Sequence, residues 1–205
     1  MTPEVLTSDG LQLQAEADVP TNASAIVVLS HPHPMFGGDM YNPLIDYLFE
    51  ALPKAGVGAL RYNFRGVGRS QGEFADAVGE RLDAAAAFAA GVELAGGSPV
   101  WSCGWSFGGD VSLSADHAGL AGWIAVAAPL KIVDPSEMAA PADARPKLLI
   151  VPEHDQYRTP ASAADATAEW TNARLVQIDG ADHFLGTQAA AVADAVNDFI
   201  GSAAS

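Results

Sequence analysis

The feature that most constrains the fold of this chain is an alternation of short apolar runs with longer alanine-rich segments. The short runs are continuous and rich in β-branched residues, which is typical of strands buried on both faces of a sheet. The longer segments have the apolar spacing of helices. Strands that alternate with helices predict βαβ units, and therefore an α/β fold with a mostly parallel sheet and helices on both faces. The expected strands are Leu11–Val19, Ala25–Ser30, Gly58–Tyr62, Val100–Gly104, Trp123–Ala127, Lys147–Pro152 and Arg174–Ile178, and the expected helices are Tyr41–Ala55, Asp76–Ala95, Gly108–His117, Ser162–Trp170 and Thr187–Ile200.

The N-terminal segment differs from the rest of the chain. Thr7-Ser8-Asp9-Gly10 is a turn sequence, and an alternating strand follows it. This pattern predicts an antiparallel hairpin at the edge of the sheet. The chain has no repeat of fixed period and no low-complexity linker, and its 205 residues suit one domain. We therefore expect a single domain over residues 1–205 without a large lid, since the irregular connection Lys131–Arg145 is too short to form one.

The most specific motif in the sequence is Gly104-Trp105-Ser106-Phe107-Gly108, a G-x-S-x-G. It follows an expected strand and opens an expected helix, which is the context of a nucleophile elbow. The serine of such a turn has a strained backbone, so the residues two before and two after it have to be small. Cys103 is the alternative nucleophile, but the bulky Trp101 and Trp105 stand at those positions around it. We therefore expect Ser106 to be the nucleophile and Cys103 to be a buried thiol.

A nucleophilic serine needs a general base, and the base needs an acid that fixes its tautomer. Of the five histidines, His183 lies in a loop between the last expected strand and the last expected helix. Such loops open at the same sheet edge as the elbow. Asp155 follows the preceding expected strand, which gives the order serine, acid, histidine that elbow enzymes have. We expect His183 to be the base and Asp155 the acid, with Glu153 as the nearest alternative acid.

The loop His31–Asp39 follows the second expected strand, where an elbow enzyme obtains its second oxyanion donor. The first donor is the N–H of Phe107, directly after the nucleophile. The two prolines have no N–H, which leaves His31, His33 and Met35 as possible donors in the segment His31–Met35. Of these we expect His33 to be the second donor, with Met35 as the alternative. The apolar side chains close to these residues in sequence predict a substrate pocket lined by Met35, Phe36, Trp105 and Phe184.

Two segments suggest cofactor sites and are better explained otherwise. His31-x-His33 could supply two metal ligands, but no third and fourth ligand stands at a suitable spacing. Arg65–Gly72 is glycine-rich, but its third glycine comes one residue late for the dinucleotide motif G-x-G-x-x-G. We expect this segment to be a packed turn in which Arg65 bonds neighbouring carbonyl groups. The sequence therefore predicts no metal and no cofactor.

The charge of the chain restricts its partners. It has 25 acidic and 10 basic side chains, a formal net charge of −15. Phosphate backbones and anionic membrane surfaces would be repelled, so we expect neither nucleic acid nor a membrane as partner.

Residues Met1–Gly10 contain no basic side chain, unlike a signal peptide, and Cys103 is the only cysteine, so no internal disulfide can form. We expect a cytoplasmic protein, whose oligomeric state the sequence leaves open.

Four motifs stand in register along the chain, namely Leu29–Pro34 with Gly37–Met40, Phe64–Ser70, Gly104–Gly108 and Asp182–Phe184. Together they resemble the small bacterial α/β-hydrolases that have no large cap. The resemblance extends over nearly the whole chain. It implies the α/β-hydrolase fold and a serine-hydrolase triad of Ser106, Asp155 and His183, but it implies no particular substrate.

These expectations combine into one reaction, in which Ser106 forms an acyl-enzyme that water cleaves. Without a large lid, and with apolar side chains near the site, we expect small or short-acyl carboxylic esters as substrates. Arg65 and Arg158 are the nearest basic residues by sequence, and basic residues are few, so neutral esters are favoured over strongly anionic ones. A thioesterase or peptidase with the same triad, and a non-catalytic binding protein on a hydrolase scaffold, are the alternatives.

Overall fold

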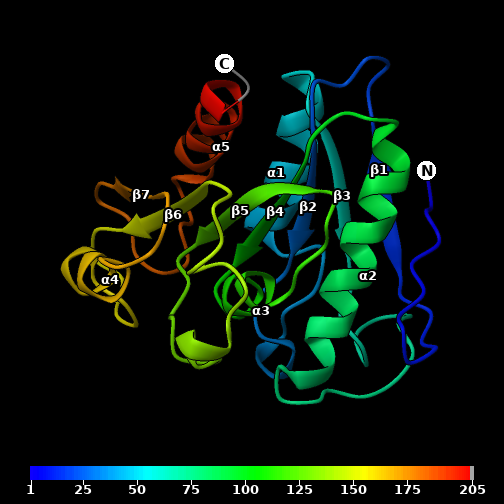
Figure 1. Ribbon diagram of the computed structural model, residues 1–205, viewed down its shortest axis with the longest axis horizontal. Coiled ribbons are helices and arrows are strands. Elements are labelled where there is room, and N and C mark those ends of the chain that lie inside the picture. The colour runs from blue at the N-terminus through cyan, green and yellow to red at the C-terminus, as the bar shows by residue number, and fades with distance from the viewer. Residues whose placement is uncertain (204–205) are drawn as a thin grey trace.

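The computed structural model describes residues 1–203, which form a seven-stranded sheet with helices on both of its faces (Figure 1). The strand order is β1-β3-β2-β4-β5-β6-β7. β1 is antiparallel to β3, and every other pair of neighbours is parallel. The prediction of a mostly parallel α/β sheet with an antiparallel N-terminal edge is therefore confirmed. The strands are β1 (Ala15–Asp18), β2 (Ile26–Ser30), β3 (Gly58–Tyr62), β4 (Val100–Trp105), β5 (Leu120–Val126), β6 (Lys147–Pro152) and β7 (Ala173–Ile178).

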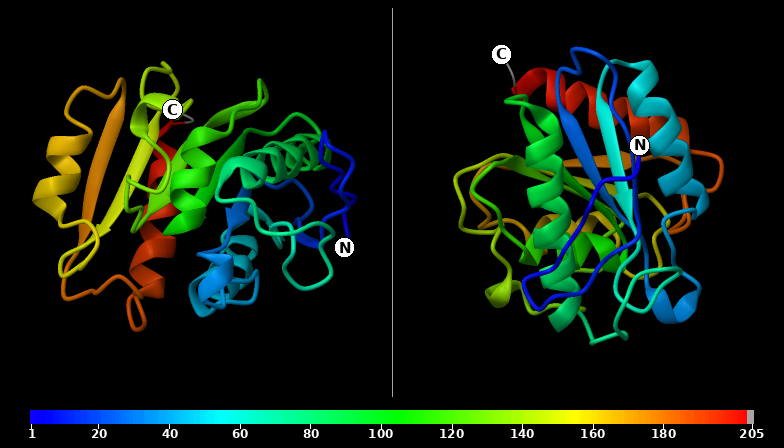
Figure 2. Two further views of the ribbon diagram at one scale, coloured as in Figure 1. Left: turned by 90° about the horizontal axis from the view of Figure 1, so that it is seen from below. Right: turned by 90° about the vertical axis from the view of Figure 1, so that its right-hand side faces the viewer.

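The helices divide between the two faces of the sheet. Their bounds are α1 (Pro43–Lys54), α2 (Val78–Ala95), α3 (Phe107–Ser114), α4 (Pro160–Ala166) and α5 (Ala189–Ala203), with short 3-10 helices η1 (Pro34–Phe36) and η2 (Pro135–Glu137). α2 and α3 cover one face, and α1 and α5 cover the other (Figures 1 and 2). Among the described residues, no helix combines the length and the apolar character needed to cross a bilayer.

Two hydrophobic cores lie on opposite sides of the sheet, and the central strands contribute to both. In β2, Ile26 and Val28 pack in the core beneath α2 and α3, whereas Val27 and Leu29 pack in the core beneath α1 and α5. All five residues of β2 are buried. Because successive strand residues point to opposite faces, a strand buried on both faces has to be largely apolar. This explains the continuous apolar runs of the sequence.

The N-terminal strand is shorter than the expected Leu11–Val19. The turn before it forms as expected, with Gly10 N–H donating to Thr7 O at 2.9 Å, and Leu6 and Gln12 make an isolated antiparallel bridge. The backbone N–H groups of Gln12 and Gln14 then donate to side chains of the segment after β3, rather than to a neighbouring strand. Regular pairing with β3 therefore begins only at Ala15.

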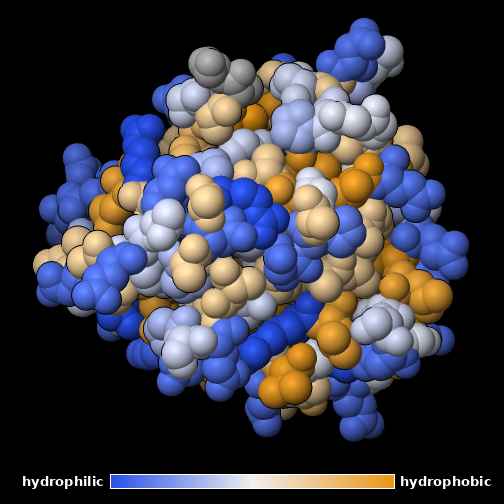
Figure 3. Space-filling model, viewed as in Figure 1, coloured by the Kyte–Doolittle hydropathy of each residue, from blue (hydrophilic) through white to orange (hydrophobic). Residues whose placement is uncertain are grey.

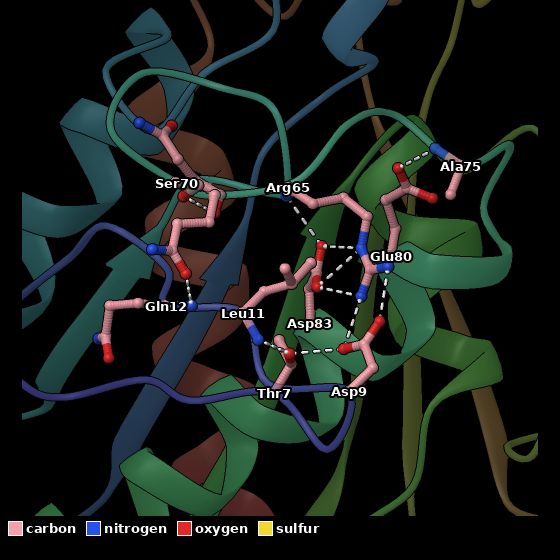
Figure 4. Close-up of polar contacts among 11 residues, drawn as sticks. Thr7, Asp9, Leu11, Gln12, Arg65, Ser70, Ala75, Glu80 and Asp83 are labelled. Carbon is pink, nitrogen blue, oxygen red and sulfur yellow. Dashed lines mark hydrogen bonds and ion pairs between the residues drawn. The ribbon is translucent and has the colours of Figure 1, made fainter.

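Arg65 fixes the N-terminal turn to α2, as Figure 4 shows. Its guanidinium lies 2.8 Å from Asp83 of α2, whose side chain is fully buried, and 3.0 Å from Asp9 of the turn. The expectation that Arg65 bonds carbonyl groups is therefore wrong, because its partners are carboxylates. A buried carboxylate is costly unless a cation is paired with it, which accounts for the choice of partner. The turn Arg65–Gly72 is packed, as expected, and Arg65 is an internal tie between elements.

Candidate active site

Ser106 lies at the sharp turn between β4 and α3. Its backbone has φ 54° and ψ −119°, a region that residues other than glycine rarely adopt. A Cβ on Gly104 would overlap the carbonyl of Gly108, and a Cβ on Gly108 would overlap the carbonyls of Ser30 and His31. The motif therefore requires glycine at these two positions because other backbone segments lie in direct contact with them on both sides of the serine.

A chain of two hydrogen bonds leads from Ser106 to a buried carboxylate. His183 Nε2 lies 2.9 Å from Ser106 Oγ, and His183 Nδ1 lies 2.8 Å from Asp155 Oδ2. Asp155 and His183 are 2% and 5% exposed. A carboxylate only accepts hydrogen bonds, so this contact places the imidazole proton on Nδ1 and leaves Nε2 free to accept the serine hydroxyl. The structure thus brings together the three residues that the sequence selects.

Two further carboxylates, close in sequence to Asp155 or His183, and the alternative nucleophile Cys103 take no part in this chain of hydrogen bonds. Glu153 accepts the N–H of Gly180 at 2.7 Å. Asp182 accepts the N–H of Phe184, within its own loop. Cys103 is buried in β4, and burial raises the pKa of its thiol to about 12, so the reactive thiolate is scarce at neutral pH.

The loop after β2 lies beside the elbow and is held by two neutral histidines. His31 is fully buried, accepts the N–H of Phe64 at Nε2, and has Nδ1 2.7 Å from Pro32 O. The His33 ring packs 4.7 Å from the Phe107 ring, between centroids, and its Nδ1 accepts the Met35 N–H. Burial lowers the pKa of both imidazoles, that of His31 to about 4.

The backbone amides of this loop are not equally available to a ligand. The Met35 N–H is taken by the His33 ring at 3.2 Å, and the Phe36 N–H by the carbonyl of His33 at 3.1 Å. The N–H of His33, and that of Phe107 at the start of α3, have no hydrogen-bond acceptor within residues 1–203. Two free amides therefore come from the two segments that flank Ser106.

A cavity of about 560 Å³ opens above Ser106. Phe36, Trp105 and Phe184 line it as expected, but Met35 is not among the lining residues and its side chain is 67% exposed. Most of the remaining wall comes from segments that follow the carboxyl ends of β2, β5 and β6, where α/β sheets bind ligands. These lining residues, which the sequence interpretation missed, are Pro32, Gly38, Asn42, Pro129, Lys131, Ile132 and Tyr157.

The segment after β5 is fixed in the cavity wall by a buried carboxylate. Asp110, in the first turn of α3, is fully buried and accepts the N–H groups of Leu130, Lys131 and Ile132 at 2.8–2.9 Å. Burial raises the pKa of this carboxyl, although the backbone hydrogen bonds act in the opposite direction. The helix that begins at the elbow thus also positions the opposite wall of the cavity.

The cations near the cavity are not those expected from the sequence. Arg65 is paired with Asp83 and Asp9 and does not line the cavity. Arg158 donates to the carbonyls of Pro129 and Leu130, so its guanidinium is used within the fold. Lys131 is instead the one Lys or Arg among the described lining residues. Its position after β5 was a usable signal, since it follows a parallel strand at the edge where the elbow lies.

Within residues 1–203, no group of three or more His, Cys, Asp or Glu side chains is arranged to hold a metal ion. His31 also has both ring nitrogens engaged by backbone groups.

The sequence comparisons are limited. No family model matches the chain. RP471, an uncharacterised protein of Rickettsia prowazekii (strain Madrid E), is 45% identical over 73 residues, and this match covers 36% of the chain and 30% of that protein. The activity and partners of the whole protein therefore do not follow from this relative.

Solved structures match nearly the full chain. An α/β serine hydrolase homologue from Coxiella burnetii is 26% identical with a TM-score of 0.81, over 96% of this chain and 95% of that one. XC6422 from Xanthomonas campestris, an α/β serine hydrolase without lid, is 25% identical with a TM-score of 0.78, over 97% and 92%. Est1E from Butyrivibrio proteoclasticus, solved with ferulic acid bound, is 19% identical with a TM-score of 0.75, over 98% of both chains, and supports the fold alone. The chain therefore has the α/β-hydrolase fold and is similar over almost its whole length to small α/β serine hydrolases without a lid, which confirms the family resemblance that its motifs indicate.

Proposed function

We propose that this protein is a serine hydrolase that cleaves small or short-acyl carboxylic esters through an acyl-enzyme on Ser106. The observation that carries the proposal is the connected pair of hydrogen bonds from Asp155 through His183 to Ser106, at the floor of an open cavity. A serine hydroxyl is a weak nucleophile until a base accepts its proton, and this arrangement supplies the base in the required tautomer.

In the proposed reaction, Ser106 Oγ attacks the ester carbonyl while His183 Nε2 takes the hydroxyl proton. The imidazolium that forms is stabilised by Asp155 and then gives its proton to the departing alcohol. Water, deprotonated by the same nitrogen, then attacks the acyl carbon. As the bond to Ser106 Oγ breaks, His183 returns the proton to Oγ, and the acid is released. His183 Nε2 makes every proton transfer. It lies 2.9 Å from Ser106 Oγ, and the departing alcohol and the attacking water approach it at the same place.

We assign the oxyanion hole to the N–H groups of Phe107 and His33. Both amides are free among the described residues, whereas the Met35 N–H is occupied by the His33 ring, which favours His33 over Met35 as the second donor. Donors that are already oriented stabilise the developing oxyanion without reorganisation during the reaction, and one such donor contributes about 10²–10³ in kcat.

The substrate class rests on the size and the lining of the cavity. A volume of about 560 Å³ lined by Phe36, Trp105 and Phe184 suits a small, partly apolar molecule. Est1E, which shares the fold, was solved with ferulic acid bound. We propose that an acid product of about that size fits the cavity of this chain.

A panel of 4-nitrophenyl esters of increasing acyl length tests the proposal. We expect turnover that is highest for short acyl groups, and Ser106→Ala to lower kcat by about 10⁴-fold or more. A fluorophosphonate probe should label the wild type and not Ser106→Ala. A folded wild type that stays unlabelled and turns over no ester would favour a non-catalytic binding protein. Thioester and peptide substrates in the same panel separate an esterase from a thioesterase or a peptidase.

A further inference from the structure

One lysine side chain lines the candidate cavity. Of the described residues that line it, Lys131 is the one Lys or Arg, and no Asp or Glu is among them. This is unexpected in a chain with a formal net charge of −15. A cation at this place is therefore a local feature of the site and does not follow from the composition.

The backbone of Lys131 is held on both sides. The Asp110 carboxylate accepts its N–H at 2.9 Å, together with the N–H groups of the two adjacent residues. Arg158 donates to the carbonyl of Leu130 at 3.2 Å, and Leu130 itself has a positive φ of 52°. A strained residue between a buried carboxylate and an arginine indicates a defined loop conformation, so the side chain of Lys131 starts from a fixed point in the cavity wall.

The ammonium group of Lys131 lies near the catalytic constellation and is available to a ligand. Its Nζ is 5.4 Å from the centroid of the Tyr157 ring, and that ring packs against His183 with 4.5 Å between centroids. The residue is exposed, and within residues 1–203 no carboxylate lies within ion-pair distance of it. Arg61, Arg65 and Arg145, by contrast, each pair with two carboxylates.

We propose that Lys131 is a specificity-determining residue that favours esters carrying a carboxylate, on either the acyl or the alcohol part, within reach of its ammonium group. The inference rests on the proposed hydrolase function, since it assigns the substrate class of that site. It reverses the expectation of neutral esters, which depended on Arg65 and Arg158 as the nearest basic residues. The apolar wall would contact the body of the substrate, and Lys131 would pair with its charged end.

The net negative charge of the molecule does not oppose this preference at short range. Interactions between exposed charges are screened beyond about 8 Å at physiological ionic strength. A bound carboxylate therefore interacts mainly with the ammonium group beside it and much less with distant surface carboxylates. Assays should be made at such an ionic strength for this reason.

Two matched pairs of esters test the proposal. The first pair is 4-acetoxybenzoate and its neutral methyl ester, which differ in charge on the alcohol part. The second pair is monoethyl succinate and ethyl butyrate, which differ in charge on the acyl part. For at least one pair, we expect Lys131→Met to lower the ratio of kcat/KM, charged over neutral, by about 5-fold or more relative to wild type, as for a charge-assisted contact. Comparing ratios between variants removes the intrinsic reactivity of each ester.

Two variants control for fold and for total charge. Lys131→Arg keeps a cation and should retain most of the preference for the charged ester. Arg174→Met removes one positive charge from an exposed position on β7, outside the cavity lining, and should leave both ratios within twofold of wild type. If Arg174→Met lowers the ratios as much as Lys131→Met does, the effect belongs to the net charge and the proposal is overturned.

Binding separates this proposal from the proposed hydrolysis. In the Ser106→Ala background, 4-acetoxybenzoate should bind about 5-fold more weakly when Lys131→Met is added, as followed by an NMR titration. Turnover of both pairs with ratios that change less than twofold overturns the Lys131 assignment and leaves the hydrolase standing. If Lys131→Met weakens binding but no ester is turned over, the hydrolase proposal is overturned and the Lys131 contact stands. If Lys131→Met leaves binding unchanged and no ester is turned over, both proposals are overturned.

Discussion

At the scale of single residues, the strained backbone of Ser106 is the cost of exposing its side chain. A non-glycine residue held at such φ/ψ angles costs on the order of 1–3 kcal/mol. The neighbouring strand and helix impose the angles, since Ser106 N–H donates to Val126 O of β5 at 2.9 Å and Ser106 O accepts from Gly109 N–H at 2.8 Å. The strained conformation directs Oγ towards His183. In an unstrained strand conformation the serine side chain would instead be buried within the sheet.

Asp155→Asn tests the role of the buried acid at this same scale. The replacement keeps the size of the side chain, but it offers a neutral amide to His183 and no longer fixes the proton on Nδ1. We expect kcat to fall by about 10³–10⁴-fold with little change in KM. Steady-state kinetics on a 4-nitrophenyl ester, with circular dichroism to verify folding, measures this.

Glu153→Gln is the matched control, because Glu153 stands two residues earlier and bonds the N–H of Gly180 instead. We expect its kcat to stay within a few-fold of wild type. If Glu153→Gln were the more damaging of the two changes, the assignment of the acid to Asp155 would be wrong.

The sequence predicts the residues that a motif or a chain order defines, and misses those that long-range contacts position. Ser106 follows from its motif, and His183 and Asp155 follow from their order after strands. Lys131 was missed because the segment after β5 carries no motif, and its place in the cavity wall depends on Asp110, which is distant in sequence. Met35 was expected in the lining by proximity, but its loop turns the side chain into solvent.

At the scale of elements, His31 joins the loops that follow β2 and β3. Its Nε2 accepts the Phe64 N–H at 3.1 Å, and its Nδ1 lies 2.7 Å from Pro32 O. Only the neutral ring with its proton on Nδ1 satisfies both contacts, because protonated Nε2 would face another N–H. Burial lowers the pKa of this imidazole from 6.5 to about 4, so the tie between the two loops depends on pH.

This depressed pKa predicts how stability changes below neutrality. Well above pH 6.5 the ring is neutral in both states, and no free energy is lost. Between pH 6.5 and about 4 the unfolded chain binds a proton that the folded protein does not, so the free energy of unfolding falls as the pH falls. From pH 7 to pH 5 the loss from this one group is about 2 kcal/mol.

The measurement is urea unfolding of wild type and His31→Gln across this pH range. The quantity of interest is the difference in unfolding free energy between the two proteins, because all other titrating groups cancel in it. A pH-independent difference for His31→Gln would contradict the buried, neutral state of His31.

The element boundaries show which parts of the fold are local. β3 and β6 match the expected Gly58–Tyr62 and Lys147–Pro152, since a buried apolar run bounded by turns defines each strand by itself. α4 ends at Ala166, four residues before the expected Trp170, where the Thr167 hydroxyl bonds back to Ala163 O. Such endings depend on side-chain hydrogen bonds that apolar spacing does not encode.

At the scale of the whole molecule, the acidic excess acts on stability. The chain has 25 acidic and only 10 basic side chains. The basic residues that pair with carboxylates include Lys54, Arg61, Arg65, Arg81 and Arg145. Many carboxylates therefore lie on the surface without a cation, and hydrophilic residues are spread across the face in Figure 3 among smaller hydrophobic groups. On α5, Asp194 and Asp198 are both exposed and stand one turn apart, where like charges repel.

This self-repulsion predicts that salt stabilises the protein. Folding brings the surface carboxylates closer together, so salt that screens their repulsion favours the folded state. Salt also weakens the attraction within ion pairs, but these are fewer, so the stability lost there is smaller. We expect Tm to rise by about 2–4 °C, or roughly 1 kcal/mol, between 20 and 300 mM NaCl, and equally in KCl. The triple change Glu93→Gln, Asp194→Asn and Asp198→Asn, all at exposed positions, should raise Tm at low salt and reduce its dependence on salt. A wild-type Tm that falls with added salt would mean that attraction within the ion pairs contributes more to stability than repulsion among the surface carboxylates takes away.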